Sequence, residues 1–311
     1  MADTKRGHVP NHLLIALALD PAQTRLSAGS RLAADQALRL ATATGARARL
    51  FHSKAADEAW HAERGDYVPT PPGLAAPGRA ALDALLDEFR RAGVEAELEL
   101  SEEAAWRGIL RSVARNDIDW VISGKRNEAE GGGHKIGSVA MKLLRKCPVP
   151  VWVVRPGVPC EPRRVLAATD LSPVGARVMS LAAFVADCFG AALHVVHSFQ
   201  LPFDVQWEGE EAAREFEHRE RASCRRKLEE EVAATRFAGE VHYYVGLTSP
   251  THAILACNQR IDPDLVVMGT VSRGGLAGLL VGNTAERLLG RLDCSLLTVK
   301  PDDFVCPVEL D

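Results

Sequence analysis

The chain has 311 residues, of which 47% are hydrophobic and 25% are charged, and its net charge is −4 at pH 7. This composition is that of a soluble globular protein and excludes an intrinsically disordered chain. The length suggests about two domains. The small acidic excess argues against nonspecific binding to nucleic acid, because such binding needs a basic surface.

No segment is predicted to enter a membrane or to direct export. The apolar stretch from Leu13 to Leu19 is too short to span a bilayer, and the start from Met1 to His12 lacks the layout of a signal peptide. The seven cysteines are scattered and form no Cys-x-x-Cys pair. That usage favours free thiols in a reducing compartment. We therefore expect a cytoplasmic protein that binds neither membranes nor nucleic acid.

The most informative feature is an internal repeat. An apolar run that closes on an aspartate occurs twice, ending at Asp20 and at Asp170. Three later matches share one offset of 145 residues: Gly124 with Gly269, Gly137 with Gly282, and Arg155 with Lys300. A constant offset without gaps indicates a duplicated domain, with one copy at 10–156 and the other at 162–301. The breaker-rich segment Pro156–Pro162 is the expected joint.

Within each copy, short apolar runs alternate with longer segments that suit helices. The first copy is expected to end its strands near Asp20, Ser53, Leu100, Gly124 and Arg155, with helices near 27–45, 76–92, 103–115 and 137–146. The second is expected to end its strands near Asp170, Ser198, Val245, Gly269 and Lys300. Such runs are typical of parallel strands covered on both faces. The sequence thus predicts an α/β fold with two tandem, open, doubly wound, parallel five-stranded sheets.

One long segment, from Glu208 to Glu231, mixes acidic and basic residues densely. It is expected to form a solvated helix whose Phe216, Ala222 and Leu228 contact the sheet or the other copy. A lid or a partner-docking helix is the alternative.

Polar residues and glycines follow the expected strand ends, where open parallel sheets bind their ligands. In the second copy a loop runs from Gly269 to Gly282 at the expected start of a helix. Glycine lets backbone approach a ligand closely, and a helix N-terminus offers N–H groups to phosphate. Together these features suggest a nucleotide site. The alternative stays open, because an aspartate before Ser-Pro, such as Asp170, is often a turn or cap residue.

These residues resemble the universal stress protein family, and in particular its members with two tandem domains. The family's nucleotide-binding signature is glycine, two residues, glycine, nine residues, then glycine followed by serine or threonine. The spacing is intact in both copies, as Gly269, Ser272, Gly282 and Asn283 and as Gly124, Asn127, Gly137 and Ser138. Serine or asparagine replaces the middle glycine, and Asn283 replaces the usual hydroxyl residue, with Thr284 following. The resemblance implies a Rossmann-like fold of the adenine-nucleotide alpha-hydrolase type.

By this resemblance the ligand is ATP, with or without Mg²⁺. Asp170 is expected to face the adenine or ribose, and the residues from Ser272 to Thr284 are expected to hold the phosphates. The implied site in the second copy is Asp170, Ser198, Met268, Gly269, Ser272, Gly282, Asn283 and Thr284. The weaker set in the first copy is Asp20, Ser53, Gly124, Asn127, Gly137 and Ser138. Because the loop from Lys125 to Ile136 is charged, the second copy is favoured.

No catalytic residue and no metal ligand is predicted. Neither first strand is followed by the dinucleotide fingerprint, and Ser138 stands where a P-loop would have its lysine. His194 and His197 are three residues apart on an expected strand, so they point to opposite faces and cannot share one metal. At most slow ATP hydrolysis is expected.

Two functions remain open at this point, beside a weaker third, an ATPase proper. The first is a stress-response regulator that binds ATP, mainly through its second domain. The alternative is a scaffold or protein-interaction module whose nucleotide site is a relic. The resemblance also implies a homodimer, with the two copies paired inside each chain through Pro150–Arg155 and Ser295–Lys300, and an unidentified protein partner.

Overall fold

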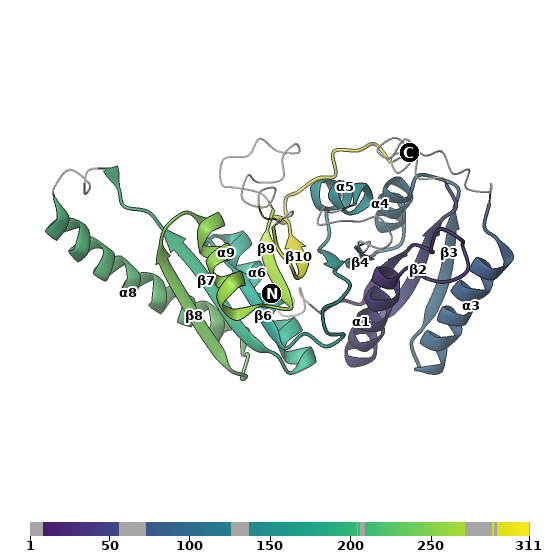
Figure 1. Cartoon of the computed structure of the whole chain (residues 1–311), viewed down its shortest axis with the longest axis horizontal. Coiled ribbons are helices and arrows are strands. Elements are labelled where there is room, and N and C mark those ends of the chain that lie inside the picture. Colours follow the sequence, from purple (N-terminus) through teal and green to yellow (C-terminus); the bar gives the residue numbers. More distant parts are fainter. Residues whose placement is uncertain are drawn as a thin grey trace, which may run out of the picture. The chain divides into compact units, whose positions relative to one another are not determined.

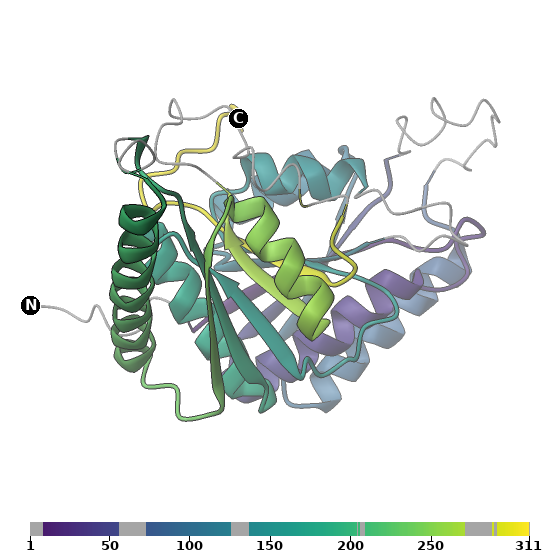
Figure 2. The ribbon, with the colours of Figure 1, turned by 60° about the vertical axis from the view of Figure 1, so that its left-hand side comes forward.

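A computed structural model describes residues 9–55, 73–125, 137–203, 205, 209–270, 288 and 291–310. The chain divides into two compact units. Of the described residues, those in 9–160 and 303–310 form the first unit, and those in 161–302 form the second. Each unit is an α/β layer structure (Figures 1 and 2).

The first unit is built on five parallel strands in the order β3-β2-β1-β4-β5. They are β1 (His12–Leu17), β2 (Arg47–Ser53), β3 (Ala96–Ser101), β4 (Trp120–Gly124) and β5 (Val151–Val154). Its described helices are α1 (Ala28–Thr44), α3 (Ala76–Arg91), α4 (Ala105–Arg115) and α5 (Ser138–Lys146). Helices α4 and α5 pack against each other.

The second unit repeats this plan, with parallel strands in the order β10-β9-β6-β7-β8. They are β6 (Arg164–Ala168), β7 (Ala192–Phe199), β8 (Val241–Leu247), β9 (Leu265–Gly269) and β10 (Ser295–Val299). Its described helices are α6 (Pro173–Phe189), α8 (Glu210–Thr235) and α9 (Pro250–Ile261). The prediction of an α/β fold with five parallel strands in each copy is confirmed. Of the helices in the described ranges, none is both long enough and apolar enough to cross a membrane.

The first helix of each unit has the same start and stop signals. Ser27 caps α1 and Ser172 caps α6, each accepting a hydrogen bond from a backbone N–H three residues on. Each helix ends at a glycine in the left-handed region, Gly45 with φ 73° and Gly190 with φ 64°. Glycine adopts this conformation without the Cβ penalty that other residues incur.

A carboxylate anchors the first strand of each unit to its neighbour. Asp119 Oδ2 accepts hydrogen bonds from the N–H groups of residues 11–12, at 2.5 and 2.9 Å. Asp264 Oδ2 accepts them from residues 163–164, at 2.8 and 3.0 Å. These aspartates are 145 residues apart, so the repeat preserves a structural device.

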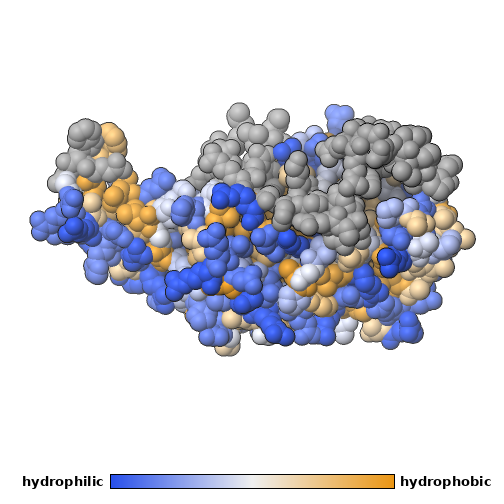
Figure 3. Space-filling model, in the orientation of Figure 1, coloured by the Kyte–Doolittle hydropathy of each residue, from blue (hydrophilic) through white to orange (hydrophobic). Residues whose placement is uncertain are grey.

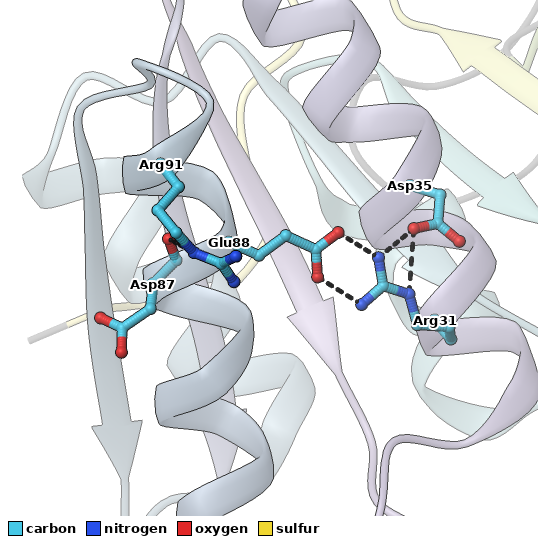
Figure 4. Close-up of polar contacts among 5 residues, drawn as sticks. All are labelled: Arg31, Asp35, Asp87, Glu88 and Arg91. Atoms are coloured by element: carbon cyan, nitrogen blue, oxygen red, sulfur yellow. Dashed lines mark hydrogen bonds and ion pairs between the residues drawn. The ribbon is translucent and has the colours of Figure 1, made fainter.

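Helices α1 and α3 are joined by an ion pair (Figure 4). Arg31 on α1 donates hydrogen bonds to both oxygens of Glu88 on α3, each at 2.8 Å, and it also contacts Asp35. These hydrogen bonds from Arg31 lower the pKa of Glu88. The pair fixes α3 against the first turns of α1.

The longest helix, α8, confirms the predicted element but only part of its predicted face. Its buried residues are Cys224, Leu228 and Val232, which recur every four positions. Ala222 is exposed, so the prediction that it contacts the sheet is wrong. Phe216 is half-buried, and its ring lies 6.5 Å from that of Phe199. The outer side of α8 is hydrophilic (Figure 3), as expected for a solvated helix.

In the first unit, α1 crosses the end of β4 with backbone against backbone. A Cβ atom added to Gly124 would lie 2.2 Å from the carbonyl carbon of Gly29, and one added to Gly29 would lie 2.0 Å from the carbonyl oxygen of Lys125. In the second unit, a Cβ on Gly269 would meet the Cγ1 atom of Val174 at 2.9 Å. The first contact involves rigid backbone, whereas the second involves a side chain that can rotate.

We therefore expect Gly124→Ala to destabilise the first domain by about 1–3 kcal/mol, because overpacking forces the helix away from the sheet. Gly269→Ala is the matched control and should cost much less. Urea unfolding followed by far-ultraviolet circular dichroism, which reports on both domains, measures the two effects. Equal effects of the two substitutions would contradict the packing argument.

The two units differ in the polar groups that lie between the outer strands and the helix that follows them. In the first unit, Arg49 forms ion pairs with Glu97 and Glu99, the latter at 3.0 Å. Ser112 on α4 donates a 2.7 Å hydrogen bond to Glu99. The first unit thus holds a neutralised ionic cluster at this place.

The second unit has imidazole and phenol groups at the positions 145 residues further on. The rings of His194 and His242 stack with centroids 4.6 Å apart, and His194 Nδ1 lies 3.1 Å from the Tyr244 hydroxyl. His242 is 3.0 Å from Glu240, and the Arg260 guanidinium of α9 lies over the Tyr244 ring. His194 is 6% exposed. Burial and the neighbouring His242 lower the pKa of His194 to about 4.

The stability of the second domain should therefore fall in acid. Unfolded histidine binds its proton near pH 6.5, so the contribution of neutral His194 is complete above that pH. It is lost as the pH drops towards 4, by about 2–3 kcal/mol. Urea unfolding between pH 4 and pH 7 measures this loss. His194→Asn should flatten the dependence, and His197→Asn, on the other face of the strand, should leave it in place.

Candidate functional site

The register of the second sheet brings the candidate side chains of β6 and β7 to one edge. Ala168, the last residue of β6, lies opposite Val196 on β7 and Met268 on β9. Asp170 and Ser198 each lie two residues beyond this level, at the carboxyl ends of neighbouring parallel strands. Both residues therefore lie at the carboxyl-end edge of the sheet, where ligands of this fold class bind.

The end of β9 lies at the same edge. Met268 is 3% exposed and belongs to the core. Gly269 ends the strand and leads into Thr270, whose N–H donates to the carbonyl oxygen of Val299 on β10. Lys300, only 4% exposed, donates a 2.6 Å hydrogen bond from Nζ to the Thr270 hydroxyl. A buried cation thus lies directly at the start of the candidate loop.

Asp170 also organises its own turn. Its carboxylate accepts a 3.0 Å hydrogen bond from the N–H of Ser172 and a second one from the Ser172 hydroxyl. Leu171 between them has φ 57°, in the left-handed region that side chains seldom adopt. A Cβ on Gly175 would lie 2.9 Å from Asp170 Oδ1. Asp170 is exposed, so it combines a turn function with a position open to a ligand.

Glu231 on α8 is a residue of this region that sequence reasoning missed. Its Oε2 atom is buried and has no hydrogen-bond partner in the described part of the chain. Burial and the charge of Asp170 raise the pKa of Glu231, while a hydrogen bond from Thr169 acts in the opposite direction. No periodicity or motif could have revealed it, because α8 carries many glutamates.

We expect Glu231→Gln to raise the melting temperature of the second domain at pH 8. The folded-state pKa of Glu231 lies above the unfolded value of 4.5. The stability it contributes is therefore complete below pH 4.5 and is lost as the pH rises through the folded-state pKa. Glu88→Gln is the control with the opposite sign, since Glu88 is held ionised by Arg31. Differential scanning calorimetry at pH 5 and pH 8 tests both, and a lower melting temperature for Glu231→Gln at pH 8 would contradict the account.

The first copy does not place an aspartate at the position of Asp170. Leu13 lies opposite Trp120, and Val165 lies opposite Leu265, 145 residues after Trp120. Leu13 and Val165 are therefore structural equivalents. Five residues further on, the position that corresponds to Asp170 is held by Ala18.

Asp20 lies two residues beyond that position, in the longer loop after β1. The strand ends at Leu17 rather than near Asp20. The Asp20 carboxylate accepts hydrogen bonds from the Thr24 N–H at 2.7 Å, the Thr24 hydroxyl at 3.0 Å and the Arg25 N–H at 3.2 Å. Although burial opposes them, these hydrogen bonds lower the pKa of Asp20. The pairing of Asp20 with Asp170 by sequence is thus corrected, and Asp20 is a loop residue.

The other candidates of the first copy are held in local structure. Ser53 donates a 2.6 Å hydrogen bond to the carbonyl oxygen of Glu103. Gly124 lies against the backbone of α1. Gly137 is the N-cap of α5, and Ser138 is the first residue of that helix.

Several predicted residues lie outside the described part of the chain: Asn127, Ser272, Gly282, Asn283 and Thr284. Within the described ranges, no group of three or more histidine, cysteine, aspartate or glutamate side chains could hold a metal ion.

Comparison with known proteins gives a consistent result. The model of the universal stress protein family matches residues 15–155 and 161–300. The chain is 27% identical to the universal stress protein E homolog of Haemophilus influenzae over 72% of this chain and 75% of that protein. It is 30% identical to universal stress protein E of Salmonella typhi over 54% and 56% of the two chains.

Two solved structures share the fold over nearly the whole chain. A protein of unknown function from Pseudomonas aeruginosa PAO1 aligns with a TM-score of 0.72 and 22% identity, over 96% of both chains. A universal stress protein from Archaeoglobus fulgidus aligns with a TM-score of 0.64 and 20% identity, over 93% of this chain and 98% of that one.

Proposed function

Because this chain belongs to the universal stress protein family, with two tandem copies of the family domain, we propose that it is a stress-response regulator that binds ATP through its second domain. One observation carries the choice of domain. Two residues beyond the paired positions Ala168 and Val196, the second copy has Asp170 and Ser198. The first copy has Ala18 at the position that corresponds to Asp170.

The chemistry of the edge supports a nucleoside with phosphates. An exposed carboxylate at Asp170 suits hydrogen-bond donors on a base or ribose. Gly269 at the end of β9 opens the loop that carries the glycine signature. The ammonium group of Lys300, which donates to the Thr270 hydroxyl, adds positive potential at this strand end. The edge as a whole therefore matches a ligand with a polar head and an anionic tail.

The described residues suit binding more than turnover. A hydrolase needs a general base or a metal-bound water near the γ-phosphate. Asp170 is occupied with the Ser172 turn, and Glu231 faces Asp170 from α8. We therefore expect slow hydrolysis at most. A regulator that holds its nucleotide can change the surface it presents to a partner.

Calorimetric titration of nucleotide-free protein with Mg-ATP tests the proposal. We expect one site per chain, a loss of affinity of about tenfold or more in Asp170→Asn, and loss of binding in Gly282→Val. Asp20→Asn is the matched control in the first copy and should leave ATP affinity unchanged.

Two outcomes would contradict the proposal. Binding that depends on Asp20 but not on Asp170 would move the site to the first domain. Absence of ATP binding in the unmodified protein would favour the scaffold alternative. That alternative is motivated by Asn127 and Ser272, which replace the middle glycine of the signature in the two copies.

A further inference from the structure

Positive charge gathers on two helices of the first unit, α4 and α5, which pack against each other (Figure 1). Together they contain six basic residues and no acidic residue, although the whole chain has a net charge of −4. The basic residues are Arg107, Arg111, Arg115, Lys142, Arg145 and Lys146.

Three of these cations surround one indole ring. The ammonium groups of Lys142 and Lys146 lie 5.2 and 4.7 Å from the ring centroid of Trp106, and the guanidinium of Arg107 lies 5.3 Å from it. In the described ranges, none of the three forms an ion pair with a carboxylate. We call these four residues the Trp106 cluster. The electron-rich face of the ring offsets part of the repulsion among the cations, but it leaves their net charge in place.

The acidic residues near the start of α4 do not neutralise the Trp106 cluster. Glu102 pairs with Lys54, and Glu103 pairs with Arg111. The first turns of α4 and α5 carry no acidic side chain, and no side chain caps either helix. The positive end of the α4 dipole, where Trp106 and Arg107 lie, therefore adds to the potential of the cluster.

The surroundings favour a small anion over a protein surface or a nucleic acid. A protein interface needs an open apolar centre, but the exposed large apolar side chains in the described ranges are Val9, Phe203 and Val305, not Trp106. A nucleic acid would need a basic footprint far wider than this cluster. Because the three cations all lie within 5.3 Å of one ring centroid, a compact ligand with several charges suits them best.

We propose that the Trp106 cluster binds linked phosphoryl groups, as in a short inorganic polyphosphate. This site lies on α4 and α5 of the first domain, whereas the ATP site is proposed for the second domain. It is also specific to the first copy, because Thr251 and His252 stand 145 residues after Trp106 and Arg107.

Isothermal titration of the full chain with sodium tripolyphosphate tests the proposal. We expect saturable binding that weakens as the salt concentration rises, because exposed charges are screened. The double variant Lys142→Gln/Lys146→Gln should weaken it about tenfold. The control Arg226→Gln/Lys227→Gln removes the same charge from exposed positions on α8 and should change the affinity less than about twofold.

Two further titrations identify the source of the phosphoryl groups and separate this site from the nucleotide site. Titration of the Gly282→Val variant with Mg-ATP shows whether a nucleotide triphosphate also binds to the Trp106 cluster. The lysine double variant should keep the Mg-ATP affinity of the second-domain site. Hexaglutamate should bind much more weakly than tripolyphosphate. Equal tripolyphosphate binding by the lysine variant and its control would overturn the proposal, and so would tighter binding of hexaglutamate or no binding of tripolyphosphate.

Discussion

The close crossing of a helix over the end of a strand sets the geometry of each domain. In the first unit, Gly29 and Gly124 let the backbones of α1 and β4 meet without side chains between them. In the second, Val174 of α6 contacts Gly269 through its side chain, and Gly175 makes room for the side chains of Thr169 and Asp170. The glycines that the sequence suggested for a ligand thus have a packing function first. Because the helix is held there, the loop before it is positioned at the sheet edge.

The two copies keep one scaffold and differ in their polar groups. Both anchor the first strand through an aspartate, Asp119 or Asp264, and both cap the following helix with a serine. The loop between the first strand and its helix, however, has ten residues in the first copy and four in the second. The short loop leaves Asp170 at the edge of the sheet, and the long loop uses Asp20 internally. The proposal of a nucleotide site in the second copy rests on this difference between the two copies.

Much of the fold could be predicted, because buried parallel strands leave continuous apolar runs and the helices carry clear caps at Ser27, Gly45 and Ser172. The alignment of Asp20 with Asp170 could not be tested from the sequence. The two-residue shift between them appears only when the register of β1 with β4 is compared with that of β6 with β9. The prediction that Ala222 contacts the sheet failed because α8 buries only a narrow stripe of residues. Which residues belong to that stripe depends on how the helix lies against the sheet.

The remaining site features depend on contacts distant in sequence. Glu231 reaches the turn at Thr169 and Asp170 from another helix. Lys300 closes a buried strand, yet its ammonium group pairs with Thr270, thirty residues earlier. Neither contact follows from a motif, since both depend on how the chain packs after it folds.

The central claim is that the second domain keeps a nucleotide-binding site at the edge of its sheet and that the first domain has lost it. A crystal structure of the full chain with a non-hydrolysable ATP analogue and Mg²⁺ tests it most directly. The account predicts one nucleotide per chain, with its adenosine between Asp170 and Ser198 and its phosphates towards the segment after Gly269. A nucleotide at the carboxyl ends of β1 and β2, next to Ala18, would contradict it.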